Sequence, residues 1–94
     1  MKHYIIGKFK PQVTDRAIQC SRIAELFSAA VKIPGIHGAE VYKNCIDRDN
    51  RFDVMIVLDM EKDALSAWDG SALHRQWKDT FGTILEKKAI FDRE

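Results

Sequence analysis

The most unusual hydrophobic pattern in the chain is FDVMIVLDM, residues 52–60, which is apolar at five successive positions. Successive residues of a β-strand point to opposite faces of the sheet. One face of this segment carries five large apolar side chains, those of Phe52, Val54, Ile56, Leu58 and Met60. The other face still carries Met55 and Val57 between two aspartates. The pattern predicts a strand over about 51–60 that is buried on both sides.

Three other segments have the composition of strands. Residues 3–10, HYIIGKFK, are rich in aromatic and β-branched residues and end at Pro11, which cannot donate a ladder hydrogen bond. Residues 36–44, IHGAEVYKN, and residues 87–92, KKAIFD, are the second and fourth predicted strands, with 51–60 as the third.

Apolar residues at three- and four-residue steps predict a helix over about 14–31, with the Thr14 hydroxyl as its cap. Its stripe consists of Ala17, Cys20, Ile23, Ala24, Phe27, Ala30 and Val31. Pro34 and Gly35 then turn the chain.

A second helical region begins at Glu61 and is interrupted at Gly70, after which Ser71 can cap another helical piece. The apolar side of that piece carries Leu73, Trp77, Phe81 and Ile84. The element order is therefore β-α-β-β-α-β, the order of ferredoxin-like α+β folds, with both helices on one face of a four-stranded antiparallel sheet.

The face of the sheet that the helices leave uncovered predicts assembly. Five large apolar side chains are worth roughly 7–15 kcal/mol on burial, more than a soluble monomer leaves exposed. We therefore expect two sheets to pair into a dimeric α+β barrel. The interface residues expected for this homodimer are Phe52, Val54, Ile56 and Leu58. The alternative is that loops or the C-terminus cover this face.

Length and charge narrow the class of protein. A chain of 94 residues predicts one domain, residues 1–94. A net charge of +1, with 15 basic and 14 acidic residues, favours neither nucleic acid nor an anionic membrane as partner. No apolar run approaches the ~18 residues that span a bilayer. Cys20 and Cys45 form no disulfide framework or CxxC motif, which indicates reduced thiols and a cytoplasmic location.

Several segments together resemble the stress-responsive A/B barrel (dimeric A/B barrel, or Dabb) domain family. They are KHYIIGKFKPQVT, KIPGIHGAEVYKN, RFDVMIVLDMEKDALSAW, ALHRQW and AIFD, and the first two are the most distinctive. The resemblance covers nearly the whole chain. It implies a homodimeric barrel of stress-response type, with a pocket between each sheet and its own helices.

One member of that family, olivetolic acid cyclase, closes a linear polyketide by aldol condensation without metal or organic cofactor. The resemblance aligns two of its pocket histidines with His3 and His74. A pocket tyrosine of the cyclase falls at Trp68 and another histidine at Asp53, so this chain lacks both. The HPAH turn of the family is SALH here. This chain therefore lacks the tyrosine of the cyclase's acid–base pair, and the indole in its place cannot exchange protons usefully.

Three residues are candidates for chemistry. Histidine exchanges a proton near neutral pH, so His3 as general base and His74 as its partner could remove a proton beside a carbonyl. Asp53, on the strand expected beside the first, could orient the His3 ring. The alternative is that all three are structural. His3 would then be a strand-end residue, His74 a partly exposed helix residue, and Asp53 a strand-edge partner of a basic residue. These three also make up two histidines and a carboxylate, the ligand set of non-haem iron sites, but they lack local ligand spacing.

The same reasoning predicts which residues line the pocket. Gly7, on the face of His3 and Ile5, would leave room for a ligand. The expected ligand-binding residues are Ile5, Gly7, Met55, Trp68, Trp77 and Phe81. As an alternative, Trp77 and Phe81 belong to the core. We expect no metal and no cofactor.

Three functions remain open at this point. The first interpretation is a dimeric barrel protein that binds a small, partly apolar ligand. A cofactor-independent, polyketide-cyclase-like lyase or isomerase using His3 and His74 is the second. A cofactor-free monooxygenase is the third. The position of the two histidines discriminates among them, because a single apolar cavity holding both favours an enzyme.

Overall fold

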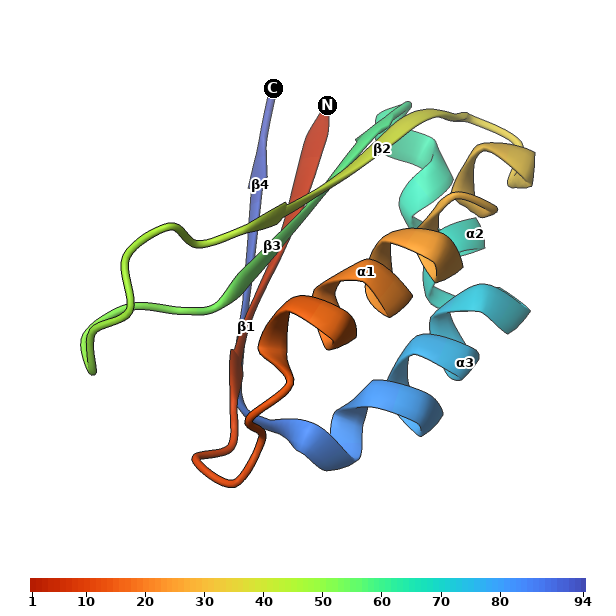
Figure 1. The fold of residues 1–94 in the computed structure, drawn as a ribbon. Helices are drawn as coiled ribbons and strands as arrows, with labels where there is room; N and C mark the ends of the chain where they lie inside the picture. Colours follow the sequence, from red (N-terminus) through yellow and green to blue (C-terminus); the bar gives the residue numbers. More distant parts are fainter.

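Four strands form one antiparallel sheet, and the helices lie together on one side of it (Figure 1). The structure is a computed structural model that describes residues 1–94. The strands are β1 (Lys2–Phe9), β2 (Ile36–Lys43), β3 (Val54–Met60) and β4 (Leu85–Arg93). The helices are α1 (Arg16–Phe27), α2 (Leu65–Asp69) and α3 (Ala72–Phe81), with 3₁₀ turns η1 (Ala30–Lys32), η2 (Lys62–Ala64) and η3 (Gly82–Ile84).

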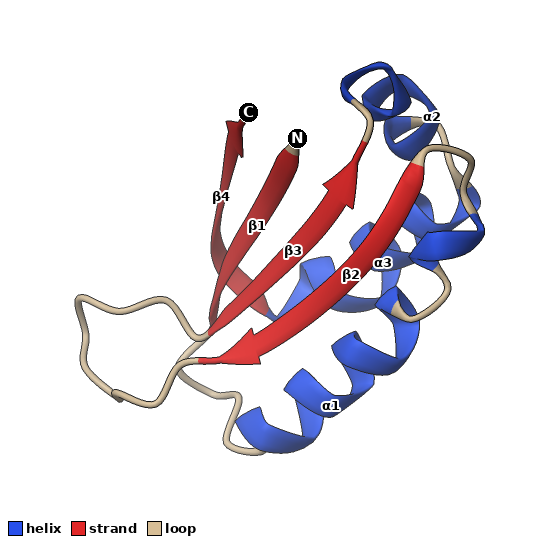
Figure 2. Ribbon diagram, turned by 90° about the horizontal axis from the view of Figure 1, so that it is seen from above, coloured by secondary structure: helices blue, strands red, loops and turns tan.

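The strand order in the sheet is β2-β3-β1-β4, so β1 and β3 are central and the other two are edges. All three pairings are antiparallel. Seen from above, the helices form a second layer against one face of the sheet, and no element covers the other face (Figure 2). The predicted order of elements and the ferredoxin-like fold are thus confirmed.

Helix boundaries follow local chemistry. The predicted helix over 14–31 is α1 followed by a separate 3₁₀ turn, and its N-cap residue is Asp15 rather than Thr14, without a side-chain hydrogen bond. The Ser71 cap is confirmed, because its Oγ accepts a hydrogen bond of 3.1 Å from the backbone N–H of His74. None of the helices has the length and apolar composition that crossing a membrane requires.

The prediction that Val54, Ile56 and Leu58 of β3 face a partner subunit was wrong. Val54, Ile56 and Leu58 are at most 2% exposed within the single chain, because they point toward its own helices. They pack in one core cluster with residues such as Phe27 and Trp68. Of the four residues expected at the interface, only Phe52 lies outside this core, half-buried just before β3 begins.

The reason lies in the charges at the ends of the other face. Met55 and Val57 share their side of β3 with Asp59. If that side faced the helices, a carboxylate would be buried beneath them. Asp59 instead forms an ion pair of 3.3 Å with Lys2 on the side away from the helices. The uninterrupted apolar set therefore takes the core side.

The sheet side without helices is nevertheless apolar, and we call it the open face. Directly opposed residues of antiparallel strands share a face, so the register places Tyr4, Val57 and Phe91 in one row across it. Its apolar residues are Tyr4, Ile6, Tyr42, Met55, Val57, Ala89 and Phe91. Phe91 is 61% exposed and Tyr42 51%. An apolar surface of this extent therefore exists, but different residues form it from those expected.

Candidate functional site

A cavity of about 300 Å³ opens between the helix-facing side of β1 and β4 and the helices α2 and α3. Alternation along the strands supplies one wall and the helices supply the other. Eleven residues line it: His3, Ile5, Leu65, Trp68, Asp69, His74, Trp77, Lys78, Lys88, Ile90 and Asp92. Five of them, namely His3, Ile5, Trp68, His74 and Trp77, are residues that the sequence predicted for this pocket. The two histidines therefore do face one cavity.

His3 is paired with a carboxylate. It is buried, at 4% exposed, and lies directly opposite Asp92 in the β1–β4 register. Its Nδ1 is 2.5 Å from Asp92 Oδ1. A carboxylate accepts the ring proton and fixes it on Nδ1, which leaves Nε2 as the unprotonated nitrogen.

The free nitrogen of His3 is accessible. Nε2 makes no hydrogen bond within the chain, and no fully buried side-chain nitrogen or oxygen lacks a partner. Nε2 is therefore not fully buried, and His3 is one of the residues that line the cavity. A largely buried imidazole that is held by a carboxylate at the wall of a cavity has the arrangement of a general base.

His74 is held in a similar way by a neutral partner. Its Nδ1 lies 3.0 Å from the backbone carbonyl oxygen of Asp69, which can only accept, so the neutral ring carries its proton on Nδ1. The ring also lies edge-on to Trp68, with centroids 5.0 Å apart. The neutral ring can therefore present only an acceptor nitrogen to the cavity, which suits an O–H or N–H donor. It can polarise a carbonyl only when protonated.

The tryptophans form the inner wall. Trp68 and Trp77 are 1% and 2% exposed and both contact Phe27, with ring centroids 5.6 and 5.3 Å apart. Their packing in the core fixes their position, so the apolar wall of the cavity is preformed. The structure thus supports both readings of Trp77, as core residue and as pocket wall.

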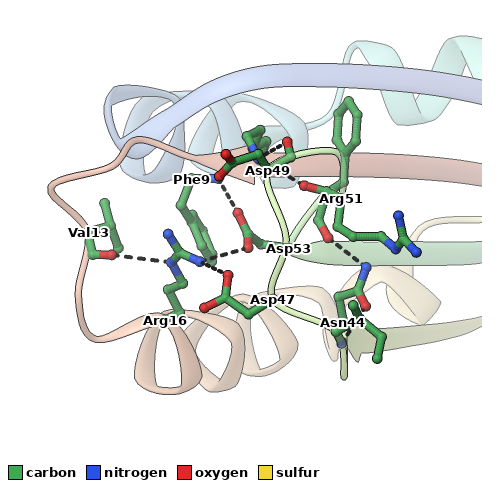
Figure 3. A network of polar contacts seen from close by, with 11 residues as sticks. Phe9, Val13, Arg16, Asn44, Asp47, Asp49, Arg51 and Asp53 are labelled. Carbon is green, nitrogen blue, oxygen red and sulfur yellow. Dashed lines mark hydrogen bonds and ion pairs between the residues drawn. The ribbon is translucent and has the colours of Figure 1, made fainter.

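Asp53 does not orient His3. It precedes β3, and its backbone N–H donates a hydrogen bond of 2.8 Å to the carbonyl oxygen of Gly7. Leu58, the residue opposite His3, is five residues further along the chain than Asp53. That separation is roughly 16 Å. Its carboxylate accepts hydrogen bonds from the backbone N–H of Phe9 and from the Arg16 guanidinium, at 2.8 and 3.3 Å (Figure 3).

Asp53 is therefore a structural residue that joins the end of β1 to the start of α1. Arg16 also pairs with Asp47 of the β2–β3 loop at 3.1 Å. The metal interpretation, with His3, Asp53 and His74 as ligands, is contradicted by the same separation. No group of three His, Cys, Asp or Glu side chains is placed to hold a metal ion.

Three further residues expected in the pocket lie elsewhere. A methyl group at Gly7 would lie 3.0 Å from Leu85 Cδ2 and 3.2 Å from Val54 Cγ1, so the space beside this glycine is occupied by the core. Met55 lies on the open face, and Phe81 is buried against Trp77, with ring centroids 5.6 Å apart. None of the three lines the cavity.

The sequence reasoning missed the residues that β4 contributes. Lys88, Ile90 and Asp92 alternate along β4 and all line the cavity. The signal was present in KKAIFD, where the aspartate shares a strand face with the isoleucine. The sequence did not reveal that β4 is the second neighbour of β1, nor that the antiparallel β1–β3 register places Leu58 opposite His3 and Asp53 near the other end of β1. As a result Asp92 rather than Asp53 faces His3.

The whole chain, residues 1–94, matches the stress responsive A/B barrel domain, and the protein belongs to this family. No curated protein sequence is significantly similar to it. A dimeric protein of unknown function with a ferredoxin-like fold from Bacteroides fragilis has 18% identity and a TM-score of 0.82, covering 99% of this chain and 93% of that one.

A lyase and a putative monooxygenase share the fold at lower identity. The hydroxynitrile lyase from Passiflora edulis has 14% identity and a TM-score of 0.73, covering 96% of this chain and 87% of that one. A putative antibiotic biosynthesis monooxygenase from Nitrosomonas europaea has 15% identity and a TM-score of 0.68, covering 99% and 98%. At these identities the similarity establishes the fold alone.

Proposed function

We propose that the protein is a homodimer that binds a small, partly apolar molecule in the cavity between its sheet and its helices. The observation that carries the proposal is the convergence of His3, His74 and two tryptophans on one cavity. Preformed, mostly apolar pockets with a few polar groups are typical of small-molecule sites. A volume of about 300 Å³ suits a ligand of one ring and a short chain.

The open face is the surface proposed for the dimer. Its apolar side chains form a continuous patch that soluble monomers rarely expose. Tyr4 and Phe91 already contact each other on it, with ring centroids 6.3 Å apart. The similarity to the dimeric Bacteroides fragilis protein supports this assembly. A second sheet packed on this face gives a two-layered barrel with the helices outside and the ligand cavities intact.

The enzymatic form of this proposal is a cofactor-independent lyase or isomerase. The pairing of His3 with Asp92 favours it, because a carboxylate stabilises the imidazolium that forms when Nε2 takes a proton. The proton leaves a carbon beside a carbonyl, or a hydroxyl group, and the electron pair remains on the ligand. His74 orients the ligand from the opposite wall. That a hydroxynitrile lyase has the same fold supports this class of reaction.

A cytoplasmic location belongs to the same proposal. Both cysteines are free, and Cys45 is exposed. Exposed thiols persist in a reducing compartment.

The experiment separates binding from chemistry. A panel of small aromatic ketones, 1,3-diketones and cyanohydrins is incubated with the protein in D₂O, and exchange or cleavage is followed by NMR. Native mass spectrometry of protein purified from its host reports the oligomer and any retained ligand. We expect a dimer, a bound small molecule, and exchange or cleavage above the rate without protein.

Three variants assign the roles. His3→Ala should reduce turnover by 10²–10⁴-fold, the usual contribution of a general base, and Asp92→Asn should reduce it less. The matched control is His37→Ala, since this histidine is exposed and pairs with Glu61 away from the cavity. Turnover that is unchanged in His3→Ala would reject the enzymatic form. A purified monomer without ligand, and no binding by any panel member, would reject the proposal as a whole.

A further inference from the structure

The cavity has two chemically different ends because of how the chain reverses after α3. The 3₁₀ turn η3 joins α3 directly to β4, so the two elements run in opposite directions along the cavity. Residues late in α3 therefore lie at the same end as residues early in β4. This places Lys78 and Lys88 at the end next to the turn, and His74 and Asp92 at the other.

Side-chain periodicity directs both lysines to the cavity. Lys78 is one helical turn after His74 and lies on the same side of α3. Lys88 is four residues before Asp92 and on the same face of β4, about 13 Å along the strand. Both lysines line the cavity together with these two residues.

Neither lysine has an anionic partner. The six ion pairs of the chain involve other cations, including Lys2, Arg16 and Lys62. No hydrogen bond from either ammonium group is formed within the chain. Two unpaired ammonium groups that border one cavity attract an anion into it.

The carboxylates of the cavity lie at the opposite end. Asp92 is hydrogen-bonded to His3. Asp69 lies beside His74, because the His74 ring is hydrogen-bonded to the backbone carbonyl of Asp69. Glu86, two residues before Lys88 in β4, forms no ion pair with it. The cavity is thus positive near the turn and carries its acid–base groups at the far end.

We infer that the ligand of this cavity is a small carboxylic acid with an apolar or aromatic body. Its carboxylate lies between Lys78 and Lys88, its body lies against Trp77 and Ile90, and its other end faces His3. This inference rests on the proposed function, since it assigns the substrate class of the same cavity. It also explains how a ligand is oriented with one particular end toward the histidines.

The test compares matched acids and amides of equal shape. Phenylacetate, 3-phenylpropanoate and 4-phenylbutanoate are titrated alongside their neutral primary amides by calorimetry at low salt. The indole N–H signals of Trp68 and Trp77 in NMR spectra confirm that a probe occupies the cavity. We expect the best acid to bind about tenfold more tightly than its amide, and this ratio to fall with added NaCl.

The variants remove the charges while keeping the side-chain stems. In Lys78→Met/Lys88→Met the ratio of acid to amide affinity should fall to about one, with amide binding unchanged. The matched control is Lys10→Met/Lys32→Met, which changes the net charge equally at two lysines that line no described cavity.

Each outcome decides something different. An acid preference that disappears only in the cavity variant supports the inference. Equal binding of acids and amides, or a preference that survives in Lys78→Met/Lys88→Met, overturns the inference and leaves the ligand cavity standing. Failure of every acid and amide to bind overturns this inference. The proposed function falls with it only if the protein purified from its host is also a monomer without ligand and binds no ketone, diketone or cyanohydrin of the panel.

Discussion

Truncating one aromatic side chain on the open face should separate the proposed dimer into subunits. Phe91 is 61% exposed in the single chain. A phenylalanine buries about 200 Å² when fully covered, so about 120 Å² of Phe91 remains for a partner to cover. At ~25 cal/mol per Å² this area is worth about 3 kcal/mol, of which alanine would retain a part.

The expected loss in Phe91→Ala is therefore about 2 kcal/mol per subunit. A symmetric interface contains the residue twice, so the loss is about 4 kcal/mol per dimer, or roughly 10³-fold in Kd. Sedimentation equilibrium over a range of concentrations measures this shift directly. Far-UV circular dichroism should show that the variant subunit stays folded, because Phe91 lies outside the core.

Ile18 provides the matched control. It is also 61% exposed, but it lies on α1 in the helix layer. Ile18→Ala should leave the Kd of the dimer unchanged. A Kd that is equal in both variants would refute the assignment of the open face, and a wild-type protein that is monomeric at all concentrations would refute the dimer.

Three further predictions test the packing. Ile56→Ala should cost about 2–5 kcal/mol of unfolding free energy in urea. Val57→Ala, one residue further along β3, should cost less than ~1 kcal/mol in the dissociated subunit. Similar costs for the two variants would mean that the faces of β3 are misassigned. Gly7→Ala should cost about 1–3 kcal/mol in the same assay, because the added methyl group meets Leu85 and Val54, and a neutral effect would show that there is room beside β1. Burial raises the pKa of the Cys20 thiol, while Lys43 lowers it and Asp53 raises it more weakly. Iodoacetamide at pH 8 should therefore modify the exposed Cys45 first and Cys20 only on unfolding. As pH rises, the Cys20 thiol of the unfolded chain loses its proton first, near its ordinary pKa of 9.0, so Cys20 makes the stability fall above about pH 9. A Cys20→Ala variant should lack this component of the pH dependence.

The sequence predicted the order of elements because each signal was local. Helix periodicity, the Ser71 cap and the Pro34–Gly35 turn act within a few residues, and all three are present in the structure. Gly35 has φ +88°, a conformation that favours glycine and that the turn requires.

The face of β3 could not be obtained from apolar content alone, because both sides of the strand are apolar. The decisive information was the charge at Asp59, which excludes its own side from the core. A test of both faces for charged ends would have assigned the strand correctly.

The candidate site was predicted in part, and for a different reason. The family resemblance pointed to His3, His74 and Trp68 as pocket positions, and helical periodicity placed Trp77 on an apolar helix face. The partner of His3 depends on the register of the two strands that flank β1, which places Leu58 of β3 and Asp92 of β4 opposite this histidine. Local patterns do not encode this long-range choice between Asp53 and Asp92.

The position of the tryptophans has a practical consequence. The chain contains two, and both lie in the wall of the cavity and against Phe27 in the core. With excitation selective for tryptophan, the fluorescence of the protein therefore comes entirely from residues that line the cavity. Quenching or a spectral shift on addition of a compound would report occupancy without a label, so a compound library could be screened on the unmodified protein in a plate reader.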